Sequence, residues 1–161
     1  NALVALVLGV SLLENGLAFA AQNPLGYLAG AQSAADYRKA NLGWYAVAIE
    51  RVNALPAGSR VTFLWEARSL ECAAPDRCAP DAIIDRWWLL RRTVGTASAA
   101  IARWKAQGMT HALIYDLGAN FVRDDPTNAF IEADWAELEA LRGQMRLIEN
   151  VGGVYSLYEL P

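Results

Sequence analysis

Four polar residues stand where two short apolar segments end, and their side chains could do chemistry. Glu66 and Arg68 follow the apolar part of RVTFLWEA, and Asp116 and Asn120 follow that of HALIYDL. In open α/β sheets ligands gather at the carboxyl ends of parallel strands. These side chains are therefore candidates for a polar crevice that could bind a sugar or a phosphate. The alternative is that Glu66 with Arg68, and Asp116 with an arginine, form ion pairs that only cap the strand ends.

A pair of tryptophans is a second candidate. Trp87 and Trp88 precede Arg91 and Arg92. This combination makes the tryptophans membrane-interface candidates, because indole rings favour the interface and arginines can contact lipid phosphates. Stacking on a sugar is another interpretation, and so is a helix with one tryptophan in the core and the other half exposed. The single histidine, His111, opens an apolar segment and is expected to be structural.

The two cysteines, Cys72 and Cys78, bracket a short loop that contains Pro75. Two cysteines do not complete a zinc site, which normally has four ligands. A disulfide fits the spacing better and indicates an oxidising compartment, while two unpaired thiols remain the alternative. The sequence has no phosphate-binding glycine loop and no metalloprotease or serine-hydrolase motif. We therefore expect no catalytic residue, cofactor or metal in this chain.

An apolar stretch runs from Ala2 to Ala21 and reads ALVALVLGVSLLENGLAFAA. About 20 apolar residues suffice for a helix to cross a bilayer, so we expect a transmembrane helix over residues 1–22. Glu14 is costly in lipid and, with Asn15, is expected to pack against other membrane helices. A signal peptide or a core helix of a soluble protein are the alternatives. The chain begins with Asn rather than Met, which suggests processing or a longer parent protein.

Charge gives the expected orientation and excludes one class of partner. The net charge is −3, and no basic stripe of the kind that binds nucleic acid is present. The first basic residue is Arg38, whereas cytoplasmic flanks of membrane helices are usually rich in Lys and Arg. We expect the C-terminal part to lie on the periplasmic or extracellular side of the cell membrane.

After a turn at Asn23–Gly26, the periodicity predicts an α/β domain with a mixed sheet, a three-layer-like arrangement and a C-terminal hairpin. Strand–helix–strand alternation implies a parallel pair with a right-handed crossover. Residues 23–32 are expected to be a linker and residues 33–161 the domain. The expected elements are a helix over 34–55 with the cap pair Ser33 and Asp36, a strand over 60–67, helices over 81–92 and 96–107, a strand over 111–117, a helix over 128–142, and two strands joined at Gly152-Gly153.

The order of motifs resembles the C-terminal end of bacterial GT-C membrane glycosyltransferases, which are related to dolichyl-phosphate-mannose protein mannosyltransferases and aminoarabinose transferases. The matching segments are the apolar span, NPLGYLAG, S-x-x-D-Y from Ser33 to Tyr37, RVNALPAGSRVTFLWEARS from Arg51 to Ser69, the cysteine-containing acidic loop, and GMTHALI from Gly108 to Ile114. The resemblance covers nearly the whole chain, and its individual motifs are mostly those of turns and strands.

This resemblance implies the terminal span and a non-catalytic extracytoplasmic domain of an enzyme that transfers sugar from a polyprenyl-phosphate donor. The catalytic carboxylate of that family lies in an early loop, and no residue here matches it. Membrane lipid, further membrane helices and a lipid-linked sugar are the implied partners. Two other functions remain open: a single-span accessory subunit of a membrane complex, and a soluble α/β binding domain.

Overall fold

The structure, a computed structural model, describes residues 1–74 and 76–161, so Pro75 of the cysteine loop lies outside the described residues. The chain divides into two compact units, Asn1–Ala46 and Val47–Pro161.

The first unit is helical. Helix α1 (Ala2–Ala21) is the apolar segment, and none of its residues is buried. Helix α2 (Pro24–Leu28) begins after Asn23, whose side chain accepts a hydrogen bond from the Gly26 N–H, and it occupies part of the segment expected to be a linker. The Ser33 hydroxyl accepts the Asp36 N–H at the start of α3 (Ala34–Leu42), which confirms the predicted cap.

The single helix predicted over 34–55 is wrong, because the chain breaks at Gly43. Gly43 has φ 59° and ψ −139°, a conformation that a residue with a Cβ rarely adopts. A new helix, α4 (Trp44–Asn53), starts directly after it. The apolar spacing continues across the break, and this continuity suggested one helix.

The second unit contains a mixed five-stranded sheet, which confirms the predicted α/β fold. Its strands are β1 (Val61–Leu64), β2 (Cys78–Ala79), β3 (His111–Tyr115), β4 (Arg146–Val151) and β5 (Tyr155–Glu159), in the order β2-β1-β3-β5-β4. Strands β2, β1 and β3 are parallel, and β5 pairs antiparallel with both β3 and β4. The expected hairpin is therefore β4–β5, turning at Gly152-Gly153.

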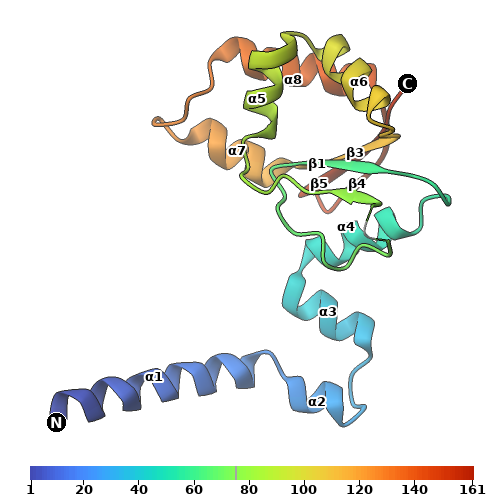
Figure 1. Ribbon diagram of the computed structural model, residues 1–161. Coiled ribbons are helices and arrows are strands. Elements are labelled where there is room, and N and C mark those ends of the chain that lie inside the picture. The colour runs from blue at the N-terminus through green and yellow to red at the C-terminus, as the bar shows by residue number, and fades with distance from the viewer. Residues whose placement is uncertain (75) are drawn as a thin grey trace. The chain divides into compact units, whose positions relative to one another are not determined.

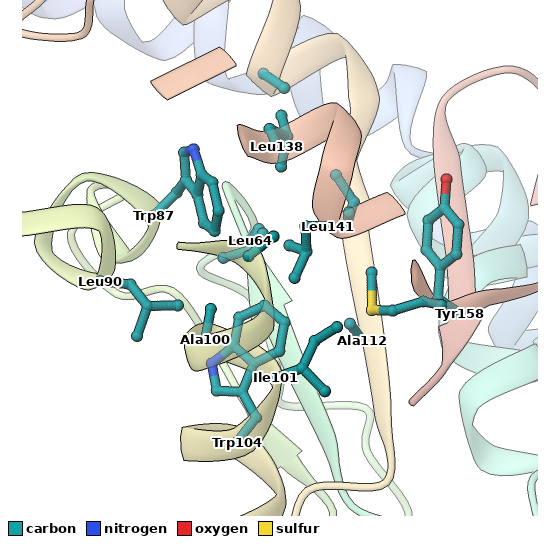
Figure 2. Close-up of a cluster of buried hydrophobic side chains, with 14 of the residues drawn as sticks. Leu64, Trp87, Leu90, Ala100, Ile101, Trp104, Ala112, Leu138, Leu141 and Tyr158 are labelled. Atoms are coloured by element: carbon teal, nitrogen blue, oxygen red, sulfur yellow. The ribbon is translucent and has the colours of Figure 1, made fainter. Parts of the chain in front are cut away.

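Helices cover both faces of this sheet (Figure 1). Helices α5 (Arg86–Val94), α6 (Ala97–Ala106) and α8 (Glu132–Gln144) lie over one face, and α4 lies on the other side of the strands. The main core fills the first interface, where Trp87, Ile101 and Leu138 face Leu64 and Ala112 of the sheet (Figure 2). Side chains alternate along a strand, so Phe63 and Leu113, both buried, face the α4 side.

Several element bounds differ from the prediction. Strand β1 ends at Leu64, because Trp65 takes a left-handed φ of 61°. Helix α5 begins at Arg86 rather than residue 81, since the Asp81 carboxylate accepts the Trp65 and Arg86 backbone N–H groups and holds a turn there. Helix α7 (Asp116–Asp124) follows β3 with no loop between them, and neither it nor the short β2 was expected.

Candidate functional site

Glu66 lies at the carboxyl end of β1, one residue after the left-handed Trp65. A non-glycine residue with this φ costs free energy and is held by its surroundings. Here the Trp65 N–H is fixed by the Asp81 carboxylate, 3.0 Å away, and the Trp65 ring stacks on that of Trp135, with ring centroids 6.0 Å apart. The turn directs the Glu66 side chain inward, and Glu66 is only 3% exposed.

The Glu66 carboxylate is held by two partners. Arg68 donates to it from Nε at 2.9 Å and from Nη2 at 2.8 Å, and the Arg68 backbone N–H adds a third bond at 2.9 Å. The hydroxyl of Tyr155, on β5, donates to Oε2 at 2.5 Å. Arg68 Nη2 also donates to the Tyr155 oxygen, 3.0 Å away, which closes the network. We call Glu66, Arg68 and Tyr155 the Glu66 network.

These contacts fix the charge states of the network. Burial opposes ionisation of Glu66, but the hydrogen bonds from Arg68 and Tyr155 outweigh it, and the pKa of Glu66 lies below its ordinary value. Burial and the neighbouring carboxylate raise the pKa of the Tyr155 hydroxyl. Glu66 is therefore an ionised, occupied carboxylate and Tyr155 a neutral phenol, and neither is poised to exchange a proton near neutral pH.

Asp116 belongs to a separate network at the start of α7. Its Oδ1 accepts from Arg142 Nη2 of α8 at 2.8 Å, and its Oδ2 accepts from the Ser156 hydroxyl at 2.7 Å. The Asn150 amide in turn donates to Ser156 Oγ at 3.0 Å. Tyr155 and Ser156 are neighbours on β5, so their side chains point to opposite faces, and the two carboxylates are held on different sides of the strand.

The structure thus does not join the four predicted crevice residues in one hydrogen-bonded cluster. Glu66 pairs with Arg68, Asp116 pairs with Arg142, and Asn120 lies exposed on α7. These contacts are those of the alternative interpretation, in which ion pairs cap the strand ends.

The cysteine loop is closed as predicted. Cys72 and Cys78 form a disulfide with Cα atoms 6.3 Å apart. The loop is also tied to the end of α4, because Arg77 Nη1 donates to the carbonyls of Val52, Asn53 and Leu55 at 3.1–3.2 Å. A guanidinium at the carboxyl end of a helix satisfies carbonyls that have no partner within the helix.

The tryptophan pair is divided between core and surface. Trp87 is fully buried, and its Nε1 donates to the Asp134 carbonyl at 3.0 Å, which agrees with the interpretation that places one tryptophan in the core. Trp88 is partly buried, and its indole N–H donates to the Ala129 carbonyl. Arg91 and Arg92 both pair with the buried Asp134.

His111 is a buried strand residue. Its Nδ1 lies 2.7 Å from the Thr110 hydroxyl, and it faces Glu159 across the β3–β5 pair. Burial lowers the pKa of His111, although the charge of Glu159 opposes this shift. These surroundings agree with the structural role expected from the sequence.

The sequence did not predict which side chains contact the Glu66 and Asp116 carboxylates. Tyr155, Ser156 and Arg142 lie 26 to 89 positions away from the groups they contact. The available signal was Tyr155-Ser156 at the start of a strand that the hairpin brings into the sheet. Locating the two residues beside Glu66 and Asp116 also required the antiparallel placement of β5 next to β3.

Fold and site define this chain as an α/β domain with a mixed five-stranded sheet, preceded by an apolar helix long enough to cross a membrane. No protein-family model, curated protein or solved structure matches it.

Proposed function

We propose that this chain is the terminal span and the non-catalytic extracytoplasmic domain of a membrane glycosyltransferase that uses a polyprenyl-phosphate sugar. The observation that carries the proposal is α1, an apolar helix of 20 residues with no buried side chain. The order of motifs supplies the glycosyltransferase class.

The exposure of α1 argues for a lipid environment. A core helix of a soluble protein buries its apolar side chains, whereas α1 leaves its large ones open. Burying one such side chain is worth roughly 1.5–3 kcal/mol, so a bilayer would stabilise this helix greatly relative to water. The exposed large side chains of α1 are Leu3, Val4, Leu6, Val7, Leu8, Val10, Leu12, Leu13, Leu17 and Phe19.

A polar stripe on α1 supports packing against further membrane helices. Ser11, Glu14 and Asn15 are spaced i, i+3 and i+4 and share one face of the helix. The Asn15 side-chain amide donates a hydrogen bond to the Ser11 carbonyl at 2.7 Å. A carboxylate at the membrane centre costs about 2.5–3.5 kcal/mol on insertion scales, and a facing polar helix would offset the cost of Glu14.

The disulfide supports the oxidising side of the membrane for the domain, since such bonds persist outside the cytosol. The resemblance to the glycosyltransferases implies that the catalytic base lies in another part of the enzyme. The domain would then guard the active-site face or guide the acceptor.

The test is to purify the natural full-length protein in detergent and to supply a radiolabelled polyprenyl-phosphate sugar with an acceptor mixture. We expect sugar transfer, and we expect a Glu14→Leu variant to lose part of it, while a Leu13→Ala variant retains it. Purification as a hetero-complex without transferase activity would contradict the proposal in favour of an accessory subunit. A detergent-free monomer would contradict it in favour of a soluble binding domain.

A further inference from the structure

A cavity of about 620 Å³ lies within the second unit, beside β1 and the short edge strand β2 and against α5 and α6. This volume is typical of pockets for small molecules. Leu89, Trp104 and Met109 supply apolar walls, and Trp104 is also part of the core shown in Figure 2. None of the four crevice residues predicted from the sequence lines it.

Three arginines line this cavity: Arg60, Arg86 and Arg103. Within residues 1–74 and 76–161, none of the three forms an ion pair, although seven other arginines do. The Arg60 guanidinium donates to two backbone carbonyls, those of Gln107 and Asp76. Guanidinium groups bind phosphate through paired N–H donors, and the charge of Asp81, which also lines the cavity, acts on Arg86.

Arg86 is fixed in position before any ligand arrives. Its Nη1 donates to Thr62 Oγ1 at 2.8 Å and to the Ala79 carbonyl at 2.7 Å, and its Nη2 donates to the Pro80 carbonyl at 2.5 Å. These three bonds use three of the five guanidinium hydrogens. Burial lowers the pKa of Arg86, so a bound anion would offset the cost of a partly desolvated charge.

Two aspartates also line the cavity, and they differ in whether their carboxylate oxygens already accept hydrogen bonds. The Asp81 carboxylate is occupied by the backbone N–H groups of Trp65 and Arg86. Asp85 stands at the N-cap of α5 but makes no capping bond, and its Oδ1 is buried without a hydrogen-bond partner among the described residues. A buried acceptor without a donor is costly, and a ligand hydroxyl would satisfy it.

We propose that this cavity binds the phosphate ester of a hydroxylated small molecule. The phosphate lies among Arg60, Arg86 and Arg103, a hydroxyl donates to Asp85 Oδ1, and the carbon skeleton rests on Trp104 and its apolar neighbours. A soluble sugar phosphate and a phosphoglycerol lipid headgroup share this chemistry. The site does not depend on the glycosyltransferase proposal.

The test is titration calorimetry of the full chain in an ethoxylated, sugar-free detergent, with glucose 6-phosphate, glucose and inorganic phosphate as probes. We expect glucose 6-phosphate to bind more tightly than inorganic phosphate, and glucose not to bind. Arg103→Gln is the main variant, because Arg103 is exposed and the fold does not rest on it. It should weaken glucose 6-phosphate binding about fivefold. Lys105→Gln, the same charge change on the same helix outside the cavity, should alter binding by less than about twofold.

Asp85→Ala separates the hydroxyl contact from the charge. Removing a negative group should tighten inorganic phosphate binding, while the preference for glucose 6-phosphate over phosphate should fall. Because Asp85 makes no capping bond, the melting temperature should not drop. An unchanged preference in a folded Asp85→Ala variant would overturn the assigned orientation of the ligand.

Doping the micelles with phosphatidylglycerol distinguishes the two sources of phosphate. Competition with glucose 6-phosphate would support a lipid headgroup, and glucose 6-phosphate binding without competition would support a soluble ligand. Absence of binding by both glucose 6-phosphate and phosphatidylglycerol would overturn the proposal. So would equal weakening by Arg103→Gln and Lys105→Gln.

Discussion

At the scale of single residues, Glu66 connects the end of β1 to β5 through its hydrogen bond with Tyr155. Its carboxylate is buried, whereas Arg68, its cation, is about half exposed. Removing one partner of a fully buried pair costs about 3–5 kcal/mol, and a surface pair is worth about 0–1 kcal/mol. The contribution of the Glu66 network to the free energy of unfolding lies between these limits, because water screens the charge of Arg68 but does not reach the Tyr155 contact.

We predict that Glu66→Gln lowers the free energy of unfolding by about 2 kcal/mol at pH 7. The folded pKa of Glu66 lies below its ordinary value, so its contribution is present above the unfolded pKa and is lost as pH falls through the folded pKa. The difference between wild type and variant should therefore shrink below about pH 4.5. Urea unfolding from pH 7 to pH 3 measures it.

The Glu66→Gln prediction has a matched control in Arg51→Gln, which breaks an ion pair with Glu149 whose two side chains are both partly exposed. That variant should lose less than about 1 kcal/mol. An equal loss in both variants, or a difference that persists undiminished at pH 3, would contradict the burial argument for Glu66.

Residue-scale chemistry could be predicted where it is local in sequence. Glu66 and Arg68 are two positions apart, so their ion pair was among the expected outcomes, and so was the cap made by Ser33. The Tyr155 contact spans 89 positions and depends on the strand order. The cavity arginines come from the loop before β1, from α5 and from α6, and no spacing in the sequence connects them.

At the scale of elements, the disulfide and Arg77 together hold the edge of the sheet. Cys78 is the first residue of β2, which pairs with β1 through Val61 and Thr62. The preceding residue, Arg77, caps the end of α4. The loop thus joins a helix on one face of the sheet to its outermost strand.

We predict that reducing the Cys72–Cys78 bond lowers the free energy of unfolding by about 2–3 kcal/mol, because a short closed loop restricts the unfolded chain. Denaturant unfolding with and without a phosphine reductant measures this. A Cys72→Ser/Cys78→Ser variant should match the reduced protein and should not respond to the reductant. A reductant effect of the same size in that variant would contradict the assignment of the loss to this bond.

The predicted elements failed where local periodicity continued across a change of direction. The apolar spacing runs through Gly43, but its backbone conformation separates α3 from α4. Helix α7 starts on the residue after β3 ends, so no turn-forming residues in the sequence indicated its start. The two-residue β2 is too short to produce an alternating pattern. The hairpin was predictable because Gly152-Gly153 supplies the positive φ that its turn needs.

At the scale of the whole molecule, two features support the proposal that the chain is anchored in a membrane and faces an oxidising compartment. The first is α1, which is long, apolar and unburied, and the second is the disulfide in the α/β unit. The composition of the two parts suggested this division from sequence alone, since charge is concentrated after residue 35. The orientation rests on the missing Lys and Arg after α1.

The most direct test of the central claim is a topology measurement on the chain with a reporter fused after Pro161, in a Gram-negative bacterium. Alkaline phosphatase folds only outside the cytoplasm, and green fluorescent protein exported by the same route stays dark. We predict an active phosphatase fusion, a dark fluorescent fusion, and retention of both in membranes after an alkaline carbonate wash. A bright fluorescent fusion would contradict the proposed orientation, and release of the chain by the wash would contradict the proposal that α1 spans the membrane.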